Sequence, residues 1–426
     1  MPVLLLLGIM LLLSLAGVPL VFSILAASLV TLFAFRPTIP LEVVPELFVS
    51  GIDTSLLLAV VFFFLSGELM NRGGVTRRLV DFANALVGRI RGGLGHVNVV
   101  SSIFFSGITG SAVADTAAIG TIMIPSMVEK GYSRGFSAAV TASSSVIGPI
   151  IPPSIPVLIY AVLASVSVGR MFLAGILPGL LIGLCLMVAV YAISRRRGYP
   201  REAGMSLGMI VRRGVDAVGA LVAPVIIVGG ILGGVFTATE AGAVAAAYSC
   251  IAGVFIYREL TWSGFWQAML NAAEGTATVL VILGASSIFA WLVADMQVNR
   301  TIAAAIFSIT DSPWAVLLLI NAFVLLIGLI MDPLAAMVIL VPILLPTVTQ
   351  LGIDPIHFGI IIVINLMIGL CTPPVGYLIF LAARIADTRP EIVIRELLPF
   401  LGALLVALLL VTYVPAFTLT LPKLMD

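Results

Sequence analysis

The sequence predicts an all-α integral membrane protein built from two inverted repeats, each with a re-entrant helical hairpin and a broken transmembrane helix. Of the 426 residues, 61% are hydrophobic and 10% are charged, and the mean hydropathy is +1.24. Apolar runs recur along the chain, most of them long enough for the roughly 17 to 25 residues that cross a bilayer core. The two halves share one pattern of glycines and prolines, and the arginines cluster in short connections.

The first 53 residues are expected to form N-terminal scaffold helices. The run from Val3 to Phe35 has no charged residue. At about 1.5 Å per residue it would overshoot a bilayer core of roughly 30 Å, so we expect Gly17 and Pro19 to divide it into two short helices. It lacks the basic region and the cleavage site of a signal peptide, and we therefore expect a retained span. The number of crossings within residues 1–35 stays open.

Residues 54–165 and 274–386 read as two copies of one unit. Five residues of the first copy match identical residues of the second without a gap, each pair being 221 positions apart, as Pro374 is from Pro153. These pairs are Pro125 with Pro346, Gly131 with Gly352, Gly148 with Gly369, Pro152 with Pro373 and Pro153 with Pro374. A Pro-Pro pair that coincides without a gap indicates a duplicated architecture.

Each copy can be divided into the same four elements. They are a span (55–70; 275–294), an amphipathic arm (72–93; 295–311), a hairpin that turns near 109–114 or 332–333, and a helix interrupted at 148–153 or 369–374. Residues 166–273 are expected to be connecting scaffold helices, and residues 387–426 a C-terminal helix. Broken backbone survives at membrane depth only inside protein or beside a polar cavity.

The arginines predict that the two copies have opposite orientations. By the positive-inside rule the first arm lies on the cytoplasmic side, because it contains Arg72, Arg77, Arg78, Arg89 and Arg91. Following the chain from there returns every later basic cluster to that side. The second arm, which has Arg300 but also Asp295 and Asp311, falls on the opposite side. Inverted repeats of this kind are typical of secondary transporters.

The breaks predict a ligand site near the membrane midplane. Helix N-termini there offer N–H groups to anions, while unwound carbonyls suit Na⁺ or H⁺. Prolines remove backbone donors, and Gly148 and Gly369 let the backbone approach a ligand closely. The candidate substrate and ion residues are Ser106, Thr109, Ser111, Asp115, Ser143, Ser144, Ser145, Gly148, Pro152, Pro153, Asp332, Asn365, Gly369, Thr372, Pro373 and Pro374.

Oxygen ligands of this type suit a hard cation, and the Na⁺ candidates are Ser106, Ser144, Asn365 and Thr372. A second interpretation stays open for these groups. A Ser or Thr hydroxyl in a membrane helix commonly bonds back to its own helix. Asp115 and Asp332 could equally be helix caps, since Asp332 precedes Pro333 as an N-cap would.

Several function classes fit the sequence poorly. The net charge of +1 does not favour nucleic-acid binding, and Cys185, Cys250 and Cys371 lie in apolar segments without metal-ligand spacing. No HExxH or paired DDxxD motif supports an intramembrane enzyme, so no enzymatic activity and no cofactor are expected. A channel stays possible on composition, but paired re-entrant breaks favour alternating access.

The same stretches carry a family resemblance over essentially the whole chain. They include SGITGSAVADT at 106–116, IGPIIPPSIP at 147–156, GGVFTATEAGA at 233–243 and GLCTPPVG at 369–376. In this order they resemble the large membrane (M) subunit, DctM-like, of tripartite ATP-independent periplasmic (TRAP) transporters. The family's hairpin tips and broken helices correspond here to residues 106–115, 143–153, 331–333 and 369–376.

The resemblance implies an elevator-type importer of the bacterial inner membrane with scaffold and transport domains. A Na⁺ gradient would drive it, a periplasmic substrate-binding protein would feed it, and a small four-helix membrane subunit would accompany it. Because this chain begins at the large subunit's first helix, that small subunit is expected to be a separate chain. The cargo is expected to be an organic acid: a C4-dicarboxylate, 2-oxo acid, sugar acid or sialic acid. The alternative is a stand-alone anion/Na⁺ symporter that needs no binding protein.

Overall fold

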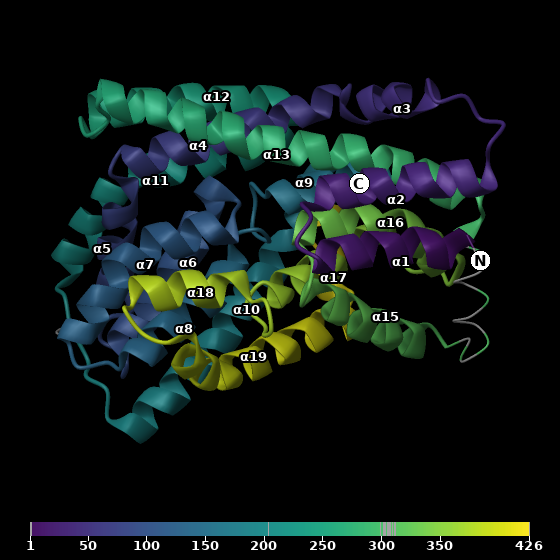
Figure 1. The fold of residues 1–426 in the computed structure, drawn as a ribbon. Coiled ribbons are helices and arrows are strands. Elements are labelled where there is room, and N and C mark those ends of the chain that lie inside the picture. The colour runs from purple at the N-terminus through teal and green to yellow at the C-terminus, as the bar shows by residue number, and fades with distance from the viewer. Residues whose placement is uncertain are drawn as a thin grey trace.

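The computed structural model describes residues 2–202, 204–298, 300, 304, 308, 310 and 312–425, and every regular element in this part of the chain is a helix (Figure 1). The first half contains α1 (Pro2–Leu15), α2 (Leu20–Phe35), α3 (Val43–Ile52), α4 (Leu58–Arg72), α5 (Val75–Val87), α6 (Gly93–Thr109), α7 (Ala112–Glu129), α8 (Arg134–Ser144), α9 (Ile155–Ala164) and α10 (Val168–Arg197). The second half contains α11 (Leu207–Leu232), α12 (Ala238–Ile251), α13 (Trp262–Asp295), α15 (Pro313–Gly328), α16 (Pro333–Gln350), α17 (Pro355–Gly369), α18 (Tyr377–Ile385), α19 (Pro390–Tyr413) and α20 (Ala416–Leu419).

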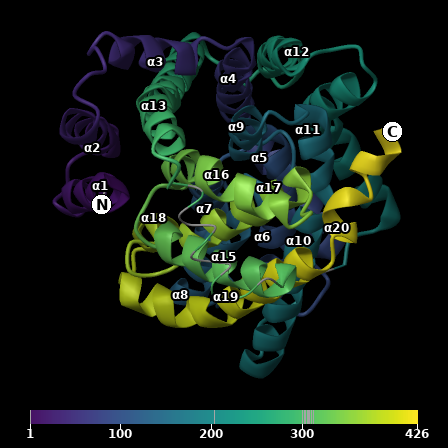
Figure 2. The ribbon, with the colours of Figure 1, turned by 90° about the vertical axis from the view of Figure 1, so that its right-hand side faces the viewer.

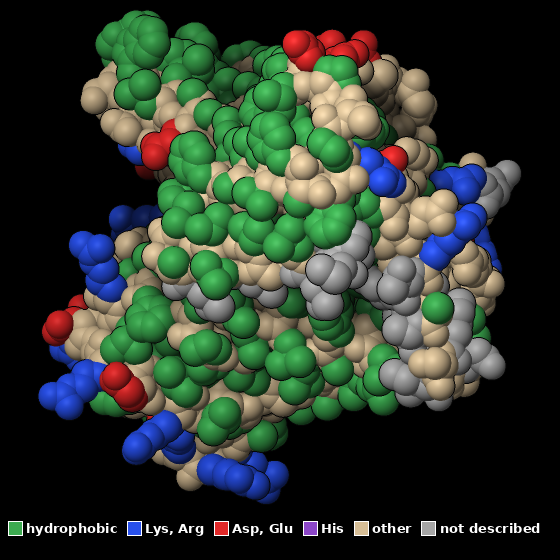
Figure 3. Space-filling view, turned by 45° about the vertical axis from the view of Figure 1, so that its right-hand side comes forward, with side chains coloured by type: hydrophobic (Ala, Val, Ile, Leu, Met, Phe, Trp, Pro, Cys, Tyr) green, Lys and Arg blue, Asp and Glu red, His purple; other side chains and the backbone are tan. Residues whose placement is uncertain are grey.

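The fold is that of a membrane protein. Within the described residues, eight helices are long and apolar enough to cross a bilayer. Hydrophobic side chains cover the middle of the face shown in Figure 3, while lysines and arginines gather toward its edges. The expected division of the first uncharged run is confirmed, since α1 ends at Leu15, α2 begins at Leu20, and Gly17 between them has a φ of 85°. Glycine adopts this left-handed backbone without the steric cost of a Cβ.

The duplicated pattern of the sequence is also a pattern of elements. A shift of 221 positions carries α7, Ala112–Glu129, onto α16, Pro333–Gln350, and carries the first residue of α8, Arg134, onto the first residue of α17, Pro355. The helix pairs α6–α7 and α15–α16 are the two hairpins. The pairs α8–α9 and α17–α18 are the two broken helices, and in each break the Pro-Pro peptide bond is cis.

The two repeats exchange their broken helices. The short helix α9, after the first break, packs against α16 and α17 of the second repeat, and α18 packs against α7 and α8 of the first. Helices α10 and α19 pack against each other and against the broken helices. We name α6–α10 and α15–α19 the hairpin unit. Residues 168–197, which belong to the stretch 166–273 expected to be connecting scaffold helices, form α10 and lie beside the hairpins.

The remaining long helices form a second layer. Helices α12 and α13 pack against α4, α3 packs against α13, and α11 packs against α12 and α5. We name α1–α4 and α11–α13 the outer layer. Figure 2 shows α3, α4 and α12 along one edge of the molecule and α8 and α19 along the opposite edge. The two groups meet where α4 and α11 contact α6 and where α13 contacts α16.

Ion pairs agree with the orientation that the arginines predict. Connections expected on the cytoplasmic side pair with one another, through Arg78–Glu259, Arg213–Asp81, Lys130–Glu202, Arg134–Asp387 and Arg197–Glu396. We call the region of these pairs the arginine-rich end. The pair Arg36–Asp295 lies at the other end of α13, whose 34 residues span about 50 Å. The two arms therefore start from opposite ends of α13. Most of the second arm, 295–311, lies outside the described residues.

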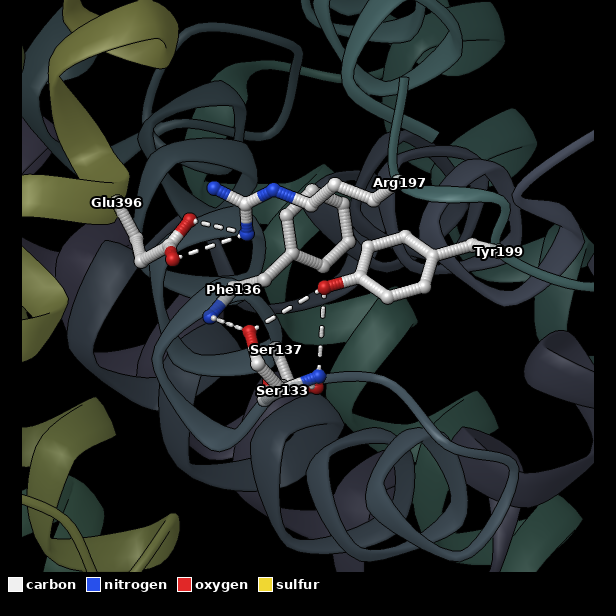
Figure 4. Close-up of polar contacts among 6 residues, drawn as sticks. All are labelled: Ser133, Phe136, Ser137, Arg197, Tyr199 and Glu396. Atoms are coloured by element: carbon white, nitrogen blue, oxygen red, sulfur yellow. Dashed lines mark hydrogen bonds and ion pairs between the residues drawn. The ribbon is translucent and has the colours of Figure 1, made fainter. Parts of the chain in front are cut away.

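A compact cluster joins three helices of the hairpin unit at the arginine-rich end (Figure 4). Arg197, at the end of α10, pairs with Glu396 of α19 at 2.8 Å. The Tyr199 ring lies 4.4 Å from the Tyr132 ring and 5.0 Å from the Phe136 ring, measured between centroids, and its hydroxyl donates to the Ser133 hydroxyl at 3.3 Å. Burial raises the pKa of Tyr132 to about 12, so its hydroxyl stays protonated.

Candidate functional site

The first hairpin turns at Gly110, whose φ of 58° falls in the left-handed region. Ser111 then caps α7 by accepting from the Ala114 N–H at 3.4 Å. The Thr109 hydroxyl, on the other side of the turn, donates to Asp115 Oδ1. The tip is therefore held by its own side chains, and Asp115 lies in the first turn of α7, where a carboxylate is favoured by the helix dipole.

Asp115 faces the first break. The residue is fully buried, and its second carboxylate oxygen, Oδ2, has no hydrogen-bond partner. A Cβ added to Gly148 would lie 2.2 Å from that oxygen. Only glycine leaves room for the carboxylate at this point, so the tip of the first hairpin and the first break make a direct contact through Asp115 and Gly148.

The serines of the first broken helix divide into two kinds. Ser143 and Ser145 donate to carbonyls of their own helix, as does Ser106 in α6. These three residues follow the second interpretation given above, in which a hydroxyl bonds back to its own helix. Ser144 also reaches a carbonyl of its own helix, that of Thr141 at 3.2 Å, but in addition it donates to Asn98 Oδ1 at 3.1 Å and accepts from Ser102 at 2.8 Å. Ser144 therefore ties the broken helix to the hairpin helix α6.

The second hairpin tip has an acid where the first has a serine. Asp332 lies 221 positions after Ser111 and caps α16, its Oδ1 accepting from the N–H groups of Leu334 at 2.9 Å and Ala335 at 3.3 Å. The capping interpretation of Asp332 is thus confirmed. This bonding uses Oδ1, and Asp332 also lines the cavities at the tips.

The second break repeats the plan with different chemistry. Asn365, 221 positions after Ser144, donates to the Asn321 side-chain oxygen of α15 at 2.8 Å, and its own Oδ1 is buried without a partner. A Cβ on Gly369 would meet the Gly328 carbonyl oxygen at 2.4 Å, so the break packs directly on the hairpin backbone. Thr372 donates to the Ile368 carbonyl at 2.7 Å.

Sequence reasoning missed the partners of Ser144 and Asn365. Asn98, Ser102 and Asn321 are buried in the hairpin helices, and Asn321 also donates to Thr412 of α19 at 3.0 Å. A signal for two of them was present, because an asparagine inside an apolar helix is costly unless it bonds across a helix interface. Which helix would supply the partner could not be read from the chain.

Two cavities collect the hairpin tips and the breaks. One, of about 110 Å³, is lined by both tips, including Ser111 and Asp332, and by Pro149 of the first break. The other, of about 340 Å³, is lined by Asp332 and Gly369 together with Val113 of α7 and Tyr377 of α18. Three of the predicted residues, Ser111, Asp332 and Gly369, therefore line cavities directly.

The other predicted residues lie in or next to the hairpin tips and the breaks without lining these cavities. Thr109 and Asp115 lie behind the first tip, Ser144 and Asn365 lie one turn before the breaks, and Thr372 lies within the second break. Pro152 and Pro153 are buried, while Pro374 is exposed and Pro373 half-buried. The first break is thus closed over by protein and the second is more open.

This arrangement of hairpins and breaks agrees with the protein family that the chain matches. A family model described as the DctM component of the tripartite ATP-independent periplasmic transporter covers residues 7–417. The chain belongs to the DctM family. The expected resemblance is therefore confirmed, and the protein is a large TRAP permease and a multi-pass protein of the bacterial inner membrane.

Relatives within the DctM family have different cargoes in their names. The sialic acid large permease SiaM of Vibrio cholerae is 41% identical over 96% of each chain, and the C4-dicarboxylate large permease DctM of Pseudomonas aeruginosa is 40% identical over 92% of each chain. The isethionate permease DctMQ of Oleidesulfovibrio alaskensis is 41% identical over 94% of this chain, which spans 63% of that protein's length.

A solved structure shares the fold. The YdaH transporter of Alcanivorax borkumensis aligns with a TM-score of 0.60 at 18% identity, over 86% of each chain. At this level of identity the likeness concerns the architecture. It shows that this architecture has been observed in another transporter.

Proposed function

We propose that this DctM-family chain is the ion-coupled membrane subunit of an importer for an organic acid anion. The best support is that both hairpin tips and both breaks line the two cavities described above, which we name the tip cavities. Such a constellation offers helix N-termini and irregular backbone at one place inside a membrane protein. In transporters of inverted-repeat design this is where substrate and coupling ions bind.

The cargo would be held by helix N-termini. None of the residues lining the two tip cavities is a lysine or arginine, and Asp332 is the charged residue among them. The helices α7, α9, α16 and α18 all begin at the tips or breaks, after Ser111, Ser154, Asp332 and Gly376. Their N–H groups and dipoles would bind a carboxylate in place of a basic side chain.

Na⁺ would compensate the acidic side chains of the site. Two buried oxygens without partners, Asp115 Oδ2 and Asn365 Oδ1, lie beside the first and second break. Carboxylate, amide and carbonyl oxygens are the ligands that a hard cation prefers. We extend the Na⁺ candidates Ser106, Ser144, Asn365 and Thr372 by Asp115 on this ground. Each repeat would then contribute oxygen ligands to a cation near its own break.

The hairpin unit would move against the outer layer. Its helices pack mainly on one another, and the cross-packing of α9 and α18 binds both repeats into one body. The outer layer, with α10 now assigned to the hairpin unit, would be the scaffold. A small four-helix membrane subunit and a periplasmic binding protein would complete the importer, and that binding protein would choose among C4-dicarboxylates, 2-oxo acids, sugar acids and sialic acids.

Uptake of radiolabelled organic acids into proteoliposomes tests the proposal. The vesicles contain this chain and its small partner, with and without the binding protein and with and without an inward Na⁺ gradient. We expect uptake only when both are present. Uptake that does not depend on the binding protein would indicate a stand-alone symporter. Uptake that does not depend on Na⁺ would contradict the proposed binding of Na⁺ at the breaks.

A further inference from the structure

A row of cavities follows one face of the hairpin helix α7 away from the tips. Val113, near the start of α7, lines both tip cavities. One turn later Ala117 and then Thr121 line a third cavity of about 340 Å³, and Ile122 and Ser126 line a fourth of about 340 Å³ near the end of α7. Thr121 is exposed although it lies inside a membrane-spanning segment. The cavities therefore follow this face of α7 from the tips toward the arginine-rich end.

The opposite wall of the third and fourth cavities is the first arm, α5. Arg77 lines both of them. Its neighbours are neutralised: Arg72 lies 3.7 Å from Glu68, and Arg78 lies 2.8 Å from Glu259. Asp81, the acid in the fourth cavity, is paired with Arg213 at 2.8 Å. Among the residues that line these two cavities, Arg77 is the positive charge without an ion pair, since Asp81, four residues further along α5, is paired with Arg213.

We propose that this row of cavities is an aqueous path between the tip cavities and the cytoplasm, and that Arg77 holds the organic anion on it by charge. The ligand class rests on the proposed function, since an anionic cargo is what gives Arg77 its role. A charge in a narrow passage with low-dielectric walls concentrates ions of the opposite sign. The tip cavities contribute no basic side chain, so Arg77 would be the first one that a departing anion meets.

Thiol labelling tests the path without any need for transport. In full-length protein with Cys185, Cys250 and Cys371 replaced, Thr121→Cys is treated from the cytoplasmic side with anionic methanethiosulfonate ethylsulfonate or cationic methanethiosulfonate ethyltrimethylammonium. The control is Ile119→Cys, at the same depth of α7 but fully buried. We expect Thr121→Cys to react at least about tenfold faster, because thiol labelling follows access. Equal rates would overturn the path.

The charge of Arg77 is tested by the ratio of the two rates. In the Thr121→Cys background, Arg77→Gln should lower the ratio of anionic to cationic labelling by about fivefold, the order expected for one nearby charge. Arg89→Gln removes the same charge from an exposed position just after α5 that lines neither cavity, and it should leave the ratio unchanged. An unchanged ratio in Arg77→Gln, or an equal fall in both variants, would overturn the role of Arg77. Because labelling needs no cargo, the labelling rates can be interpreted even if the uptake assay fails.

Discussion

Two glycines of the DctM-family site lie where the structure leaves no room for a single added methyl group. Gly148 and Gly369 are equivalent in the two repeats, but they face different neighbours. A Cβ on Gly148 would meet the Asp115 carboxylate, which belongs to a side chain, whereas a Cβ on Gly369 would meet the carbonyl of Gly328, which belongs to the backbone. A side chain can rotate away from an intruding atom more readily than a packed helix can move.

Gly148→Ala and Gly369→Ala should therefore fail in different ways. We expect Gly148→Ala to remain folded and to lose uptake at least about tenfold, because the displaced Asp115 leaves its place beside the break. Gly369→Ala should lose about 1 to 3 kcal/mol of stability as well, the usual cost of overpacking. Thermal unfolding in detergent and proteoliposome uptake measure the two effects. Gly402→Ala, which has nothing within 4 Å of the added Cβ, is the control and should match the parent protein.

At the scale of elements, the two hairpins are capped alike by different residues. Ser111 begins α7 and Asp332 begins α16, and each accepts from backbone N–H groups of the first turn. A cap needs an oxygen acceptor and no charge. The two caps therefore differ by one negative charge: the acid of the second tip is the cap itself, Asp332, beside the two tip cavities, whereas the acid of the first tip, Asp115, follows the cap in the first turn of α7.

Two substitutions separate the cap of α16 from its charge. Asp332→Ala removes the acceptor and should lower the free energy of unfolding by about 1 kcal/mol. Asp332→Ser copies the first repeat and should keep stability within about 0.5 kcal/mol of the parent, while raising the Na⁺ concentration needed for half-maximal uptake. Unfolding and Na⁺ titration of uptake are the measurements. If Asp332→Ser transports with unaltered Na⁺ dependence, Asp332 is a cap and nothing more.

At the scale of the whole molecule, the proposed movement of the hairpin unit requires that its contacts with the outer layer break somewhere. Gly107, close to the first tip in α6, lies against Pro224 in α11 of the outer layer. A Cβ on Gly107 would lie 3.1 Å from the Cβ of Pro224, a few tenths of an ångström below the separation in disulfides. This contact joins the two groups at a point that an elevator movement would shear.

A cross-link at this contact should stop transport. In the background without native cysteines, the pair Gly107→Cys and Pro224→Cys should lose most uptake on oxidation and regain it on addition of a reductant. Each single variant, oxidised in parallel, should be unaffected by oxidation. Full transport by quantitatively cross-linked protein would contradict movement between the two groups at this contact.

Much of the DctM-family architecture could be predicted from the chain alone. The breaks at Gly148–Pro153 and Gly369–Pro374, the hairpin turns and the offset of 221 positions all depend on local backbone chemistry, because glycine and proline act where they stand. The opposite orientation of the two repeats could also be predicted, from the distribution of the arginines.

The tertiary structure decided which polar groups face one another. It gave Ser144 bonds across to Asn98 and Ser102 of α6, while Ser143 and Ser145 bond to carbonyls of their own helix, although the three are consecutive in the sequence. It also brought α10 beside the hairpins and exchanged α9 and α18 between the repeats. Hydropathy and backbone propensity are properties of each segment, whereas a hydrogen bond across a helix interface depends on helix rotation and on partners far away in the chain, which no local pattern encodes.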